Sequence, residues 1–194
     1  MIATPSSSYI SSEEYLKAED SSSIRPAYRQ EEIDAMAGAS NTHVVISLNM
    51  ASMLKNHLRG SGCQTYISAT KVHIELLDIY YYPDVTVTCD QRDRTFNNFL
   101  RYPGLIIEVL SPNTEAFDRG EKFAHYRQIK SLQEYVLVSQ NRQSVECFRR
   151  NSEGQWVLYP YGQGEEIHIA SVDLRCAIAK VYEDVTFEVA QAAN

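Results

Sequence analysis

The chain has 194 residues, of which 44% are hydrophobic and 22% are charged. A domain of this size buries about 70% of its unfolded surface, so the composition argues against general disorder and favours one domain over residues 11–194 behind a flexible tail of residues 1–10. The net charge of −7 argues against a protein that coats nucleic acid non-specifically, but it is compatible with a cleft that is locally basic or holds a metal ion.

Two further features of the composition predict a cytoplasmic protein with no membrane partner. No apolar run approaches the ~20 residues that span a bilayer. The N-terminus lacks the basic start and apolar block of a secretory signal. The cysteines form no C-x-x-C pair, and we expect them to be buried, reduced thiols: Cys63, Cys89, Cys147 and Cys176.

The first predicted elements in the chain are helices. Ser11 and Glu14 form a capping box, which predicts a short helix after the Ser-rich start. A longer helix is expected over about residues 41–59, because apolar residues recur there near the 3.6-residue period. The segment Gly60-Ser61-Gly62 is expected to end it.

Short apolar runs after this helix predict strands. A second helix, over about residues 118–129, falls between two of them, and a turn at residues 151–154 predicts a C-terminal hairpin. This order predicts an α/β fold with a mixed β-sheet and additional C-terminal β-hairpin strands. The predicted strands are Cys63–Ser68, Lys71–Leu76, Asp84–Thr88, Gly104–Leu110, Glu134–Ser139, Ser144–Arg149, Gln155–Tyr159 and Glu166–Ile169.

Two acidic residues occur where a simple core would not have them. Asp84 opens one predicted strand, and Glu108 interrupts an apolar run that is typical of a strand buried on both faces. If these strands are antiparallel neighbours and Thr88 pairs with Gly104, then Asp84 lies directly opposite Glu108. Two carboxylates so close require either a proton on one of them or a positive group between them, and Mg²⁺ is a simple solution.

A lysine follows on the next predicted helix. Asp118, Lys122 and Tyr126 are spaced i, i+4, i+8 and therefore share one helix face. If this face contacts the carboxylates, Lys122 can orient the attacking water or stabilise the charge that develops on phosphorus. The alternative is that Asp118 and Lys122 form an exposed surface pair.

Four segments of the sequence, taken together and in this order, form a specific pattern. They are MAGAS followed by His43, YYYPDVTVTCD, LIIEVLSPNTEAFDRGEKFAHYRQI and EYVLVSQ. In this order they resemble the Uma-two family, which is grouped with restriction endonucleases in the PD-(D/E)xK nuclease superfamily. The resemblance covers about residues 11–190, and it implies a restriction-endonuclease-like core in which a mixed β-sheet is flanked by helices.

The resemblance implies a catalytic site of Asp84, Glu108 and Lys122, with Mg²⁺, or Mn²⁺ in its place, as cofactor. Asp84 matches the Asp of the PD motif, and Glu108 matches the acidic residue of the second half-motif. The superfamily lysine normally lies two residues beyond that acid, where this chain has Leu110, so the lysine role falls to Lys122. Glu32 matches an acidic position that could add a third metal ligand, or it is a surface acid at a strand edge.

Substrate contacts are expected from residues around this site. His43 is expected to contact a phosphate or a neighbouring carboxylate, and the alternative is a partly buried, hydrogen-bonded histidine. Arg92 and Arg94 are candidate phosphate contacts in a long loop, or else solvated surface residues. Tyr126 lies on the same helix face as Lys122 and is a further candidate.

The function predicted from these residues is Mg²⁺-dependent hydrolysis of DNA by an endonuclease. A homodimer is expected, because an exposed apolar segment occurs in the C-terminal hairpin at residues 156–159. The alternative is a catalytically silent nuclease-fold module that binds nucleic acid or a protein partner, which the acidic net charge and Leu110 favour. A hydrolase for another phosphorylated substrate is disfavoured, since the sequence has no Gly-rich phosphate loop.

Overall fold

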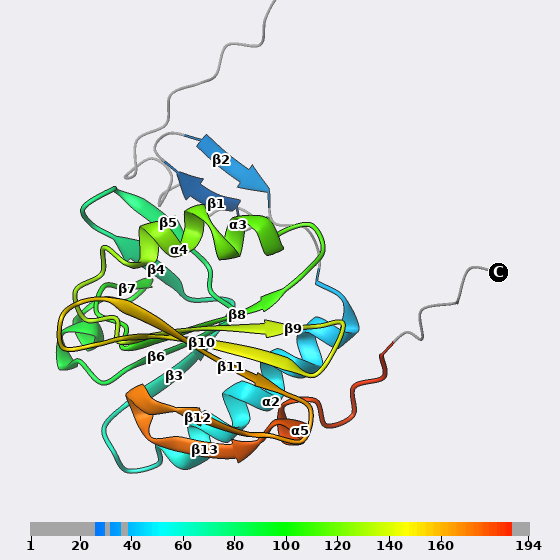
Figure 1. The fold of residues 1–194 in the computed structure, drawn as a ribbon. Coiled ribbons are helices and arrows are strands. Elements are labelled where there is room, and N and C mark those ends of the chain that lie inside the picture. The colour runs from blue at the N-terminus through cyan, green and yellow to red at the C-terminus, as the bar shows by residue number, and fades with distance from the viewer. Residues whose placement is uncertain (1–25, 30–31, 36–38, 188–194) are drawn as a thin grey trace, which may run out of the picture.

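The structure is a computed structural model that describes residues 26–29, 32–35 and 39–187, with side chains from residue 39 onward (Figure 1). The predicted tail of residues 1–10 and the short helix predicted near Ser11 lie outside these ranges. None of the helices within them combines the length and apolar character that crossing a bilayer requires.

A six-stranded mixed sheet forms the centre of the molecule, in the order β11-β10-β9-β8-β6-β3. β8 and β9 are parallel and all other neighbours are antiparallel. The parallel pair needs a crossover connection, and two short helices, α3 and α4, supply it. The strands are β3 (Gln64–Ile67), β6 (Val85–Thr88), β8 (Leu105–Leu110), β9 (Glu134–Ser139), β10 (Ser144–Arg150) and β11 (Trp156–Gly162).

Both faces of this sheet are covered, which explains why β8 is buried along its whole length. Helix α2 (Asn41–His57), helix α5 (Ile178–Val181) and the hairpin of β12 (Glu166–Ile169) and β13 (Leu174–Ala177) lie on one face (Figure 1). On the other face lie α3 (Glu115–Arg119), α4 (Glu121–Tyr126) and a second sheet. The short 3₁₀ helices are η1 (Gln91–Thr95) and η2 (Ala170–Val172).

The second sheet has five strands in the order β2-β1-β5-β4-β7. β4 and β5 are buried because they pack with α4 and β9 in a second apolar cluster. The sequence pattern did not predict β5 or β7, and it did not separate the strands into distinct sheets. The five strands are β1 (Pro26–Arg29), β2 (Glu32–Ala35), β4 (Lys71–Ile74), β5 (Ile79–Tyr81) and β7 (Phe99–Leu100).

The predicted fold class is confirmed: the chain forms a mixed sheet flanked by helices, with a C-terminal β10–β11 hairpin. The prediction of one continuous helix over residues 118–129 is wrong, because α3 ends at Arg119 and α4 begins at Glu121. Gly120 separates them, and a Cβ atom at this position would lie 3.0 Å from the carbonyl oxygen of Ala116. This close approach favours glycine at the break.

The cysteine prediction is wrong for one pair. Cys63 directly precedes β3 and Cys89 directly follows β6, and because Gln64 pairs with Thr88, the two cysteines lie opposite each other. They form a disulfide, with their Cα atoms 4.0 Å apart. The sequence separation of 26 residues contains no motif that indicates this pairing. The other two cysteines are free and buried, as expected: Cys147 and Cys176.

Candidate active site

Asp84 and Glu108 are brought together by the register of β6 and β8. The ladder pairs Val85 with Ile107, and its extension by one residue sets Asp84 opposite Glu108, which confirms the predicted register. Asp84 Oδ2 accepts a hydrogen bond of 2.8 Å from the backbone N–H of Val109. The Asp84 side chain is therefore fixed against the strand that carries Glu108.

Glu108 faces the α3–α4 side of the sheet and is almost completely buried. Its Oε1 accepts hydrogen bonds from Lys122 Nζ at 2.8 Å and from the Tyr126 hydroxyl at 3.0 Å. Burial raises the pKa of Glu108 to about 8; Lys122 opposes this shift, and the carboxylates of Asp118 and Asp84 add to it. Burial and the two neighbouring carboxylates therefore disfavour the ionised form of Glu108, and the ammonium of Lys122 favours it.

Lys122 lies between two buried carboxylates. Its Nζ atom is 2.8 Å from Glu108 Oε1 and 2.9 Å from Asp118 Oδ1. Burial disfavours the charged amine, but the two carboxylates together outweigh burial and raise the pKa of Lys122. The alternative of an exposed Asp118–Lys122 pair is wrong, because these side chains are only 4% and 12% exposed.

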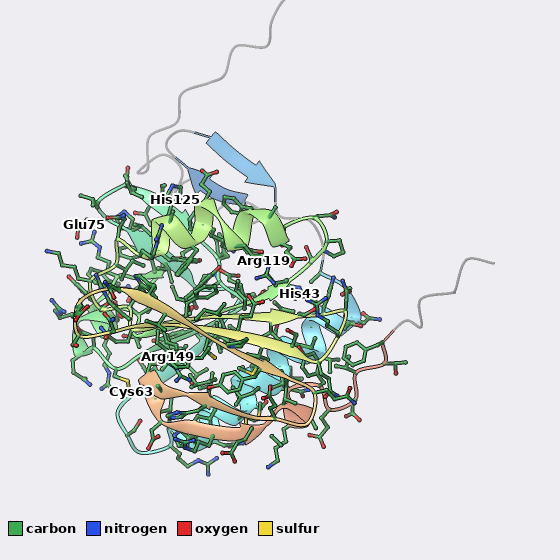
Figure 2. The ribbon with its side chains drawn as sticks, viewed as in Figure 1. His43, Cys63, Glu75, Arg119, His125 and Arg149 are labelled. Carbon is green, nitrogen blue, oxygen red and sulfur yellow. A yellow bond between two sulfur atoms is a disulfide. The ribbon has the colours of Figure 1, made fainter. Side chains whose placement is uncertain are left out.

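His43 approaches Asp84 from the beginning of α2. The Ser40 hydroxyl accepts a hydrogen bond from the backbone N–H of His43 and so caps the helix. His43 Nε2 lies 2.7 Å from Asp84 Oδ1, and both side chains are about one-sixth exposed, at 15% and 16%. His43 is therefore a partly buried, hydrogen-bonded histidine, as in the alternative interpretation, and its partner is a neighbouring carboxylate; the contact with a phosphate stays a prediction. Figure 2 shows His43 at the N-terminal end of α2.

The cluster carries more negative than positive charge. When ionised, Glu108 and Asp118 carry two negative charges beside the ammonium of Lys122, and Asp84 adds a third beside the imidazole of His43. None of these five side chains is more than 16% exposed. Such an imbalance costs free energy in a buried site unless a proton or a cation compensates it.

The donor set fits a hard divalent cation that retains water. Asp84 and Glu108 provide only oxygen atoms, which Mg²⁺ prefers. In the part of the chain with described side chains, no three His, Cys, Asp or Glu residues converge into a cage for a metal ion. Mg²⁺ is commonly bound in proteins by one or two carboxylates and several waters.

The other residues predicted to contact substrate do not have that role in this cluster. Arg92 and Arg94 follow β6 and lie at the end of that strand opposite to Asp84. Tyr126 belongs to the cluster, but it is fully buried with its hydroxyl on Glu108, so it positions this carboxylate and has no surface for substrate. Glu32 lies on β2 in the five-stranded sheet, and its side chain is outside the described part of the structure.

Two residues of the site were not predicted as such from the sequence. Asp118 is a buried partner of Lys122, and the i, i+4 spacing indicated the contact but not the burial. Tyr135 on β9 is fully buried, and its hydroxyl donates a 2.9 Å hydrogen bond to the backbone carbonyl of Asp118. Burial also raises the pKa of Tyr135 well above its usual value, so it remains a donor.

Residues 12–179 of this chain match the sequence model of the Uma2 family, which is described as "Putative restriction endonuclease". The chain belongs to the Uma2 family. The resemblance found in the four sequence strings is thereby confirmed, and it extends across the strands and helices that carry the carboxylate cluster.

Proteins similar to this Uma2 chain come from cyanobacteria. The uncharacterized protein slr1290 of Synechocystis sp. is 38% identical over 178 residues, which cover 92% of this chain and 94% of that protein. The uncharacterized protein sll1609 of the same organism is 31% identical over 173 residues, covering 88% and 98% of the two chains.

One solved structure shares the fold. It is the crystal structure of a protein titled "a putative nuclease belonging to DUF820" from Anabaena variabilis ATCC 29413. The TM-score is 0.73 at 17% sequence identity, over 90% of this chain and 98% of that chain. At this identity the likeness concerns the fold.

Proposed function

We propose that this Uma2 chain is a Mg²⁺-dependent DNA endonuclease in which Asp84 and Glu108 hold the metal ion and Lys122 assists hydrolysis. The observation that carries the proposal is a largely buried cluster of three carboxylates, two beside Lys122 and one beside His43. A divalent cation compensates their negative charge, and Mn²⁺ is expected to substitute for Mg²⁺ because it also prefers oxygen ligands.

Each residue of the cluster has a role in this proposal. A bound Mg²⁺ would polarise the phosphodiester and lower the pKa of water. Lys122 adds a positive charge beside the developing negative charge of the phosphate. Tyr126 holds Glu108 through its hydroxyl. His43 and the backbone of Val109 hold Asp84.

The alternative of a catalytically silent module loses one of its two arguments. That argument is the missing lysine at Leu110, two residues beyond Glu108. Lys122 Nζ lies 2.8 Å from Glu108 Oε1, so an ammonium group is present although it comes from a helix and not from the strand. This contact favours the enzyme over the silent module.

Removal of divalent metal is expected to abolish DNA cleavage. Purified protein should nick or cut plasmid DNA in Mg²⁺ or Mn²⁺ and should leave it intact in EDTA, with activity restored by excess Mg²⁺. Agarose gels of supercoiled plasmid measure this directly. Calorimetric titration of the metal-free protein with Mn²⁺ should detect binding. Cleavage that continues at full rate in EDTA would contradict the proposal, and an absence of both cleavage and metal binding would favour the silent module.

We also propose that the chain forms a homodimer through β11, the edge strand of the central sheet. Val157, Leu158 and Tyr159 are large hydrophobic residues with exposures of 38%, 45% and 41%. We expect light scattering at micromolar concentration to give twice the mass of one chain, and Leu158→Glu to give a monomer. The control is Leu76→Glu, at a residue 75% exposed elsewhere on the surface. A wild-type monomer would refute the dimer.

A further inference from the structure

The connection between β6 and β8 is much longer than its geometry requires. Antiparallel neighbours can be joined by a two-residue turn, whereas residues 89–104 separate these strands. We call this segment the 89–104 loop. Part of this length is structural, because the segment contains η1 and β7, and β7 pairs with β4 in the second sheet.

The backbone of the 89–104 loop is held in place by hydrogen bonds to a buried carboxylate within the loop. Asp93 is buried, and its carboxylate accepts hydrogen bonds from Thr88 Oγ1 at 2.6 Å and from the backbone N–H groups of Arg101 at 2.8 Å and Tyr102 at 3.1 Å. The disulfide at Cys89 ties the start of the loop to the end of the central sheet. Its side chains are therefore presented by a structured backbone, which lowers the entropy lost when a ligand binds.

The loop combines guanidinium groups with aromatic rings. The guanidinium carbon of Arg92 lies 3.7 Å from the ring centre of Tyr102. That of Arg101 lies 5.0 Å and 5.3 Å from the ring centres of Phe96 and Phe99, which stack on each other at 4.8 Å. The three rings and Arg101 are only partly buried. Aromatic faces beside arginines are the combination that binds single-stranded nucleic acid.

The arginines are available to a phosphate. Arg92 is 63% exposed and pairs with Asp90, and Arg101 pairs with Glu75, which is 68% exposed. The single Arg101–Glu75 contact of 3.3 Å is weak, so Arg101 can exchange this carboxylate for a phosphate at little cost. Arg92 donates to both oxygens of Asp90, so a phosphate has to compete with a stronger, bidentate pair there. Arg94, also exposed, donates to a backbone carbonyl of the neighbouring turn.

We propose that the 89–104 loop binds unpaired nucleotides of the nucleic-acid substrate, with bases stacked on its aromatic rings and phosphates on its arginines. This inference rests on the proposed nuclease function and specifies its substrate as nucleic acid with a single-stranded segment. Five residue steps along extended chain lead from Asp84 to Cys89, or about 17 Å, which is the length of about five base steps of stacked DNA. In Figure 2, Glu75 and Cys63, which flank the loop, lie on the side of the molecule away from His43.

The test compares three fluorescent probes for binding to the full chain in EDTA, by anisotropy. The probes are a single-stranded oligonucleotide, its duplex, and an abasic strand of the same length. We expect the single strand to bind at least about tenfold tighter than either of the others, because only it offers free base faces. Equal affinities for the three probes would overturn the proposal without any variant, and would indicate simple attraction of phosphates.

Variants separate the two kinds of contact. Phe96→Leu should weaken binding of the single strand about tenfold and leave the abasic strand unchanged. The double variant Arg92→Gln/Arg101→Gln should weaken binding of both. Arg175→Gln is the matched control, because Arg175 is 58% exposed on β13, far from the loop in sequence. Circular dichroism melting checks that each variant is folded.

These experiments test the loop proposal and the nuclease proposal independently. If wild-type protein cleaves DNA in Mg²⁺ but folded Phe96→Leu binds all three probes as wild type does, the loop proposal is wrong and the nuclease proposal stands. If the single strand binds preferentially and no metal-dependent cleavage occurs, the loop is a binding site and the catalytic proposal is wrong.

Discussion

Replacement of Asp84 by asparagine is expected to slow DNA cleavage in Mg²⁺ by more than about 100-fold, since the loss of a group that only hydrogen-bonds to a metal ligand already costs about 10- to 100-fold. Asparagine has nearly the same shape, so its amide can still hydrogen-bond to the backbone N–H of Val109 and to His43. The variant loses only the negative charge that a divalent cation requires. Its melting temperature should therefore remain near that of the wild type while metal binding and cleavage are lost.

The measurement is the initial rate of plasmid nicking, together with calorimetric titration of Mn²⁺ into Asp84→Asn. The control is Asp173→Asn, the same chemical change at a side chain that is 87% exposed. Asp173 has a φ of 51°, a left-handed conformation that asparagine tolerates, so this substitution should be neutral. Cleavage by Asp84→Asn at the wild-type rate would remove Asp84 from the site and with it the proposed metal centre.

The pairing of Asp84 with Glu108 was predictable because β-strands have a two-residue period. Glu108 lies between Ile106 and Leu110, which face α4, so the strand period alone orients Glu108 towards that helix. The contact between Asp118 and Lys122 was likewise predictable from helical spacing, which persists across the break between α3 and α4. Local periodicity therefore predicted most of the cluster.

The remaining features depend on contacts between distant segments. Nothing in the local sequence around Cys63 and Cys89 indicates that β3 is the edge neighbour of β6, and the disulfide follows from that neighbourhood. The burial of Asp118 depends on β9, whose Tyr135 covers the helix break. Arg92 is close to Asp84 in sequence, but the two residues lie at opposite ends of β6, because a β-strand is extended.

Replacement of Lys122 by methionine is expected to lower the free energy of unfolding by about 3–5 kcal/mol, the usual cost of removing one partner from a buried ion pair. The substitution leaves Glu108 and Asp118 buried without their shared cation. Urea denaturation in EDTA measures the change. Lys55→Met, at an exposed residue of α2, is the control and should change stability little.

The stability of the Lys122→Met variant also tests the metal centre independently of catalysis. If Glu108 is a metal ligand, millimolar Mg²⁺ should stabilise Lys122→Met more than the wild type, because the cation then compensates carboxylates that have lost their ammonium partner. The double variant Lys122→Met/Glu108→Gln should recover part of the lost stability, since it removes one of the two uncompensated acids, and should lose the response to Mg²⁺. A loss of less than about 1 kcal/mol in Lys122→Met would indicate an ion pair of the exposed kind and would contradict the buried charge imbalance on which the nuclease proposal depends.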